Sequence, residues 1–122
     1  MLQVWMDFWQ MECCGTPFSV GDEVSWLLRP ADTTALGWPG VVLDGVTVDA
    51  IEDHHGDAEA PQTVGTVTSI ATAHYRLATK PVPGSGIVTP VDTAERWNDD
   101  RGDHRFGGFL IGLLVTTDPT AG

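Results

Sequence analysis

The chain has 122 residues, 42% of them hydrophobic, which suits one domain with its own core and leaves no room for a second of ordinary size. It carries 17 acidic side chains against 6 Lys and Arg, a formal net charge of −11. Because binding a phosphate backbone requires clustered Lys and Arg, this charge argues against nucleic acid and anionic membrane surfaces as partners. With 14 Gly and 8 Pro the chain should turn often, so its regular elements are expected to be short.

The N-terminus predicts no export or membrane segment. It lacks a basic stretch and includes Asp7 and Glu12, which a signal peptide would not carry. The longest apolar run, 109–115, is far shorter than the roughly 20 residues of a membrane-spanning helix. We therefore expect a cytoplasmic protein whose adjacent Cys13 and Cys14 stay reduced, since neighbouring cysteines cannot close an ordinary disulfide.

Strand patterns begin at once along the chain. Residues 4–9 alternate in the manner of a half-buried strand, and residues 18–28 place Val24, Trp26 and Leu28 on one face. Turn chemistry at 13–17 between them predicts a hairpin-like β-arch over residues 9–26, with one cysteine buried. Asp22 and Glu23 should face water, while five side chains should pack inward: Met6, Phe8, Phe18, Val24 and Trp26.

The second half of the chain continues this pattern. Residues 41–48 are expected to form a bulged strand or short hairpin, 65–77 a long strand, and 108–116 the most hydrophobic strand, in a central position. The acidic stretch 49–63 has no Lys or Arg, and 92–105 mixes charges, so both are predicted to be exposed loops. The sequence PVPGSG at 81–86 is typical of a turn.

Many short strands with glycine-rich turns and no convincing amphipathic helix predict an all-β fold. The element FSVGDEVSW at 18–26 suits a small, strongly bent barrel of the oligonucleotide/oligosaccharide-binding or SH3-like kind. A β-sandwich is the alternative. Residues 1–118 should form the single β-barrel domain, and 119–122 a frayed tail.

A resemblance supports this description. The block WQMECCGTPFSVGDEVSW at 9–26 resembles a family of small, acidic, uncharacterised actinobacterial proteins. The stretches HHG at 54–56, GTV at 65–67 and PVPG at 81–84 are also similar to that family. The family is a domain of unknown function, so the resemblance implies a soluble, intracellular setting and carries over no catalytic residues.

The most site-like stretch is EDHHGD at 52–57. Imidazoles and carboxylates at this density can bind zinc or another divalent transition metal. The predicted metal-ligand set lies here and in the cysteine pair: Asp53, His54, His55, Cys13 and Cys14. The chain lacks the paired Cys-x2–4-Cys spacing of structural zinc sites, and a solvated acidic loop explains the same residues without a metal.

Aromatic residues offer a second kind of site. Trp5, Trp9 and Trp38 are candidate ligand-binding residues, since an exposed indole provides a stacking surface, whereas in a chain this small tryptophans also supply core area. The run NDDRGD at 98–103 lacks the spacing of a calcium loop. Arginines 96, 101 and 105 among these acids are predicted to form internal ion pairs.

Two functions remain open. The first is a non-catalytic β-barrel module, without cofactor, that binds a protein or a small molecule; a homo-oligomer is compatible with it. The second is a small metalloprotein centred on His54 and His55, for which hydrolysis is one conceivable activity. An enzymatic activity is less favoured than binding, because no nucleophile or phosphate-loop motif occurs.

Overall fold

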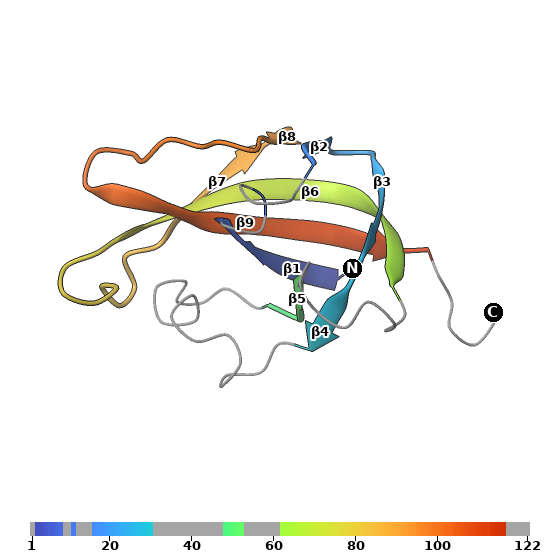
Figure 1. The fold of residues 1–122 in the computed structure, drawn as a ribbon, viewed down its shortest axis with the longest axis horizontal. Helices are drawn as coiled ribbons and strands as arrows, with labels where there is room; N and C mark the ends of the chain where they lie inside the picture. The colour runs from blue at the N-terminus through green and yellow to red at the C-terminus, as the bar shows by residue number, and fades with distance from the viewer. Residues whose placement is uncertain (1, 9–10, 12–15, 31–47, 53–61, 117–122) are drawn as a thin grey trace.

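The computed structural model describes residues 2–8, 11, 16–30, 48–52 and 62–116, and these form a single curved sheet with a small two-stranded addition (Figure 1). The described strands are β1 (Leu2–Asp7), β2 (Phe18–Ser19), β3 (Glu23–Trp26), β4 (Leu28–Pro30), β5 (Ala50–Glu52), β6 (Thr63–Arg76), β7 (Ile87–Val91), β8 (Thr93–Ala94) and β9 (His104–Val115). Among the residues just given, no helix is long and apolar enough to cross a membrane.

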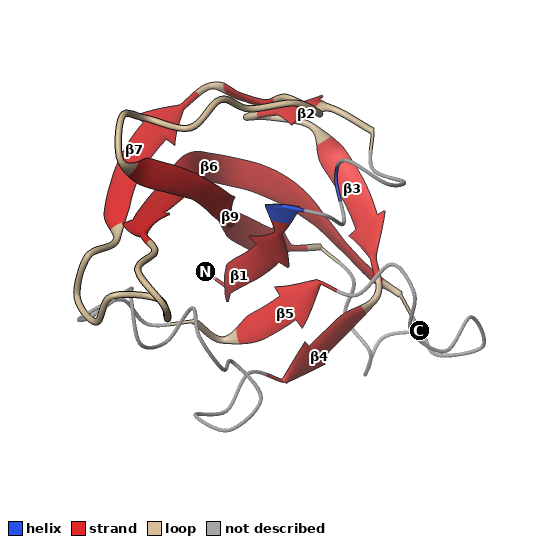
Figure 2. Ribbon diagram, turned by 60° about the vertical axis from the view of Figure 1, so that its left-hand side comes forward, coloured by secondary structure: helices blue, strands red, loops and turns tan. Residues whose placement is uncertain are grey.

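The main sheet nearly closes on itself. Its strand order is β3-β6-β9-β1-β5-β4, with β7 also paired to β6. The two ends of this order, β3 and β4, are consecutive in the chain and separated by one residue, Leu27. One extended segment therefore pairs with β6 through its first half and with β5 through its second, which joins the two ends of the sheet into a barrel-like shape (Figure 2).

Strand β9 lies in the middle of this sheet. It pairs antiparallel with β6 on one side and with β1 on the other, and eight consecutive residues, 106–113, are buried. Alternate side chains point to opposite faces of a strand, so β9 contributes side chains to two hydrophobic core clusters. Phe109, Ile111 and Leu113 enter the larger cluster, and Leu110 packs with Trp5 in the smaller one.

Strand β6 supplies the curvature. Its first part pairs with β3 and its later part with β7, while β9 runs along its other edge. The β6–β9 register shifts twice, between Val67 and Ser69 and between Ala73 and His74. Such irregularities bend a strand and increase its twist, which a 14-residue strand needs in order to follow a small barrel.

Gly108 allows β9 to approach β1 closely. Its φ is +154°, and a Cβ at this position would collide with the Met6 carbonyl oxygen and lie 2.8 Å from Cζ2 of Trp5. Only glycine meets both conditions comfortably. The backbone of β9 thus forms part of the surface against which the Trp5 ring packs.

The prediction of an all-β, barrel-like fold is confirmed, because the main sheet curves until it nearly closes. The strands predicted at 65–77 and 108–116 correspond to β6 and β9, and β9 is central as expected. The turn at 81–86 is also found, with Gly84 at a φ of +67°.

The N-terminal half differs from the prediction. The strand expected at 18–28 is divided into β2, β3 and the start of β4. The turn at Gly21 (φ +97°) separates β2 from β3, and Leu27 lies between β3 and β4. Strand β2 pairs with β8 and β3 with β6, so the described part of the expected arch contains no hairpin pairing with β1. Residues 13–15 of the expected bend and residues 41–47 of the expected strand lie outside the described residues.

Side-chain predictions for the arch are mostly confirmed. Met6, Phe18 and Trp26 are buried, Val24 is half-buried against the core, and Asp22 and Glu23 are exposed. The expectation for Phe8 is wrong: strand β1 ends at Asp7, and the ring of the next residue is 37% exposed.

Both predicted loops prove to be partly strand. The 49–63 stretch contains β5, which lies between β1 and β4 with Ile51 and Glu52 buried, and it ends in β6. The 92–105 stretch begins with β8, where Ala94 is fully buried, and it ends inside β9. Between these ends, residues 95–103 are largely exposed, as predicted.

Candidate functional site

A pocket of about 420 Å³ lies beside β3, the strand that ends the main sheet on that side. Glu23 and Ser25 point to one face of β3, and Val24 and Trp26 to the other, yet all four line the pocket. The pocket therefore lies along the edge of β3 that is not paired with β6. The described lining residues are Met6, Met11, Thr16, Pro17, Phe18, Asp22, Glu23, Val24, Ser25 and Trp26.

Apolar side chains form the inner part of this pocket. Met6 and Met11 are each 1% exposed, and Phe18 packs edge-on against Trp26 with ring centroids 5.1 Å apart. These four residues belong to the larger core cluster, so the pocket wall is continuous with the packed interior. A wall supported in this way keeps its shape without a ligand.

Two carboxylates lie at the outer part. Asp22 is held in a turn: its backbone N–H donates to the Ser19 carbonyl oxygen at 3.0 Å, and its Oδ2 accepts from the Ser19 N–H at 2.8 Å. Hydrogen bonds from Gly21 N to Val67 O, and from Val67 N to Asp22 O, fasten this turn to β6. Glu23 follows at the start of β3 and is exposed. The described lining contains no Lys, Arg or His.

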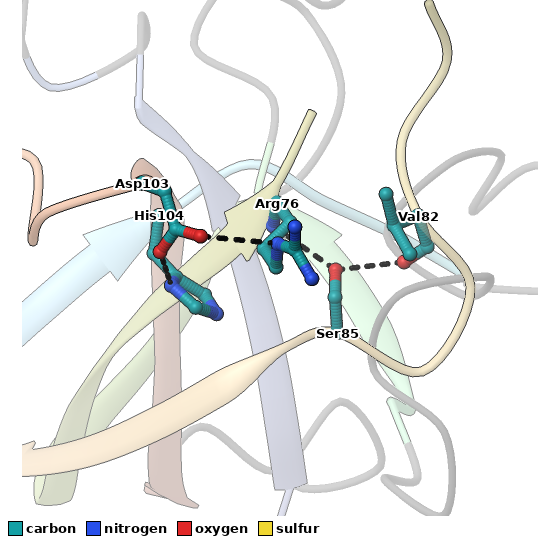
Figure 3. A network of polar contacts seen from close by, with 5 residues as sticks. All are labelled: Arg76, Val82, Ser85, Asp103 and His104. Atoms are coloured by element: carbon teal, nitrogen blue, oxygen red, sulfur yellow. Dashed lines mark hydrogen bonds and ion pairs between the residues drawn. The ribbon is translucent and has the colours of Figure 1, made fainter. Parts of the chain in front are cut away.

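A polar network lies on the surface where β6 and β9 pair (Figure 3). Asp103 contacts both His104 (Oδ1 to Nδ1, 2.8 Å) and Arg76 (Oδ2 to Nε, 3.3 Å). The hydroxyl of Ser85 accepts from the Arg76 backbone N–H and donates to the Val82 carbonyl oxygen. Because its proton is committed to a carbonyl, Ser85 is held as a turn-forming residue and not as a nucleophile.

His74 forms a third polar feature, two residues from Arg76 and at the end of β6 that lies away from β3. The ring is 3% exposed and packs against Phe106, and Nε2 lies 3.1 Å from the Asp99 carbonyl oxygen. A carbonyl can only accept, so Nε2 donates and Nδ1 is left as an acceptor. A smaller pocket of about 240 Å³ lies here, lined by Asp99 and Arg101 among others, and Arg101 donates to the Thr89 hydroxyl at 3.1 Å.

The structure does not describe any residue of the predicted metal-ligand set. Asp53, His54, His55, Cys13 and Cys14 lie outside the described residues, so this site stays a prediction. Across the described part of the chain, no three His, Cys, Asp or Glu side chains come together in a metal-binding group.

The predicted tryptophan site is only partly described. Trp5 is 1% exposed in the smaller core cluster, and its Nε1 donates to Asp7 Oδ1 at 2.7 Å. Trp9 and Trp38 lie outside the described residues, and ligand binding by the three tryptophans remains a prediction. The tryptophan that does line a pocket is Trp26, which the sequence indicated only as a core residue.

Fold and pocket together define a small all-β domain with a barrel-like sheet and a pocket at the edge of that sheet. Residues 1–117 match the model of the family of unknown function DUF6578, and the chain belongs to this family. No curated protein and no solved structure matches the chain. The expectation of an uncharacterised domain family is thus confirmed.

Proposed function

We propose that this protein is a non-catalytic binding module of the cytoplasm, and that its ligand site is the pocket beside β3. The observation that carries the proposal is the pocket itself, about 420 Å³, which lies against core side chains and exposes more polar than apolar surface. This volume falls within the range of about 300–1,000 Å³ that is typical of small-molecule sites.

The polar groups in the described lining suit binding better than catalysis. They are the carboxylates of Asp22 and Glu23 and the hydroxyls of Thr16 and Ser25. Ser25 donates its hydroxyl proton to Gln62 Oε1 at 2.6 Å, and Asp22 accepts from the backbone of its own turn. A nucleophile needs a base to take its proton, whereas the Ser25 proton is held by an amide oxygen, which is not a base.

A fragment screen by NMR tests the proposal. A ¹⁵N-labelled sample would be titrated with a few hundred small, soluble compounds covering positive, neutral and negative charge. The proposal expects hits whose chemical-shift changes cluster on Val24, Ser25 and the Trp26 indole N–H. The same spectra report on the β6–β9 surface near Asp103 and on the His74 region. Hits confined to those places, or no hits, would refute the pocket as the ligand site.

A further inference from the structure

We propose that the pocket beside β3 selects a small organic cation, an ammonium group carried on a compact aromatic or aliphatic body. This inference rests on the proposed function and names the chemical class of its ligand. It depends on three features of the pocket: the sign of its charge, the nature of its wall and the fixed position of one carboxylate.

Charge separates the classes of ligand most sharply. Asp22 and Glu23 are the charged side chains of the described lining, and both are acidic. The whole chain adds a net −11, so the surrounding potential attracts cations and repels anions. An anionic ligand would have to approach two carboxylates with no basic side chain from the described lining to offset them.

The wall suits a cation with an apolar body. Phe18 and Trp26 bring aromatic rings to the pocket, and a ring face attracts an ammonium group placed over it. Met6 and Met11 add flexible, polarisable side chains that adapt to an irregular apolar group. A strongly hydrated inorganic cation would gain little from this wall, whereas an organic amine can bury its hydrocarbon part there.

Asp22 adds preorganisation. Its Oδ2 accepts from the Ser19 N–H, and its backbone bonds to Ser19 and Val67 hold the turn, so little side-chain freedom remains to be lost when a cation binds. Binding costs fall when the receptor group is already fixed. Glu23 is exposed, so its contribution to the binding free energy should be smaller than that of Asp22 and more sensitive to salt.

Three probes with the same phenyl-alkyl body test the inference: 2-phenylethylammonium, neutral 2-phenylethanol and anionic 3-phenylpropanoate. Each would be titrated into the full ¹⁵N-labelled chain, with the Trp26 indole N–H and the Val24 amide as reporters. We expect the ammonium probe to bind at least fivefold more tightly than the alcohol. The carboxylate should be the weakest of the three.

Charge-removing variants make the assignment specific. Asp22→Asn keeps an oxygen that can accept from Ser19, and Glu23→Gln changes an exposed side chain, so both variants should fold. Each is expected to lower the affinity for the ammonium probe about two- to fivefold and to leave the alcohol unchanged, as for one partly exposed charge contact. Asp99→Asn is the matched control, because it removes one surface carboxylate away from the pocket. The Asp99 carbonyl oxygen contacts His74, which is eight residues along β6 from Thr66, and Thr66 is the residue that pairs with Glu23.

The outcomes are distinct. Preference for the ammonium probe at the pocket, reduced by Asp22→Asn and Glu23→Gln but not by Asp99→Asn, supports the inference. Equal or tighter pocket binding by the alcohol or the carboxylate overturns the cation class and leaves the proposed function intact. Ammonium-induced shifts spread over the acidic surface, with none at Trp26, also overturn it. If none of the three probes binds, the cation class is wrong, and the wider fragment screen alone decides the proposed function.

Discussion

Replacing Gly108 by Ala should destabilise the protein by two separate effects. The φ of +154° is one that L side chains rarely adopt, and the added Cβ would collide with the Met6 carbonyl oxygen and come within 2.8 Å of Cζ2 of Trp5. Neither contact can be relieved easily. The carbonyl belongs to the backbone of β1, which pairs with β9, and the Trp5 ring is buried.

Two other glycines allow these effects to be measured separately. Gly84 has a φ of +67° with nothing within 4 Å of its Cβ position, so Gly84→Ala should show the backbone cost alone, about 1–2 kcal/mol. A Cβ on Gly65, where φ is not strained, would lie 2.8 Å from both Leu113 Cγ and the Leu114 carbonyl oxygen, so Gly65→Ala should show overpacking alone, about 1–3 kcal/mol. The sum predicts about 2–5 kcal/mol for Gly108→Ala, a large part of the roughly 5–15 kcal/mol by which domains are stable.

Urea unfolding followed by tryptophan fluorescence gives the free energies of unfolding of the wild type and the three variants. The expected order of destabilisation places Gly108→Ala above both single-effect variants. A Gly108→Ala protein no less stable than Gly84→Ala would show that β1 and β9 do not approach each other as described, and would refute the packing of Trp5 against this strand.

Further predictions concern the core, the surface and the metal. Phe109→Ala should cost about 3–5 kcal/mol in urea unfolding, because the ring is fully buried, whereas Trp97→Ala, at a side chain 68% exposed, should fall within about 0.5 kcal/mol of wild type. Asp103→Asn should cost less than about 1 kcal/mol, since the Arg76 side chain and its partner carboxylate are 57% and 69% exposed; a larger loss would mean that the network of Figure 3 is structural. Elemental analysis of protein purified without a His-tag should find no stoichiometric transition metal, and one equivalent of zinc would instead favour the alternative site around His54. Duplex DNA at physiological salt should give no change in fluorescence anisotropy, and a sub-micromolar complex would contradict the charge argument.

The long central strands could be predicted from the sequence because their composition fits their place. The run FLIGLLV at 109–115 is apolar on both faces, and β9 is covered on both faces over most of that length. The stretch at 65–77 combines β-branched residues with few charges, as β6 requires to pair along both edges. In both cases local pattern and final environment agree.

The pairing partners could not be predicted, because they depend on contacts distant in sequence. Residues 50–52 were predicted to belong to an acidic loop, yet they form a strand between β1 and β4 in which Glu52 is buried. The turn at Gly21 was predicted correctly, but the local sequence does not show that the strands before and after it pair with β8 and β6.

The pocket was missed for the same reason. Phe18, Val24 and Trp26 were predicted to face inward, and Asp22 and Glu23 to face water. Only the position of β3 at the end of the sheet order shows that both sets border one space. An apolar alternation, Val24, Trp26 and Leu28, that begins directly after an acidic turn was the available signal.

The pocket as a ligand site is tested most directly by filling it. Val24 is half-buried, packs against the core and lines the pocket, so Val24→Phe would place a ring in that space. The measurement is the dissociation constant of the tightest-binding fragment for this variant and for the wild type, by NMR titration. Loss of at least tenfold in affinity, with the amide spectrum of β9 unchanged, is the predicted result. An unchanged dissociation constant in a folded variant would contradict the proposal that the ligand occupies this pocket.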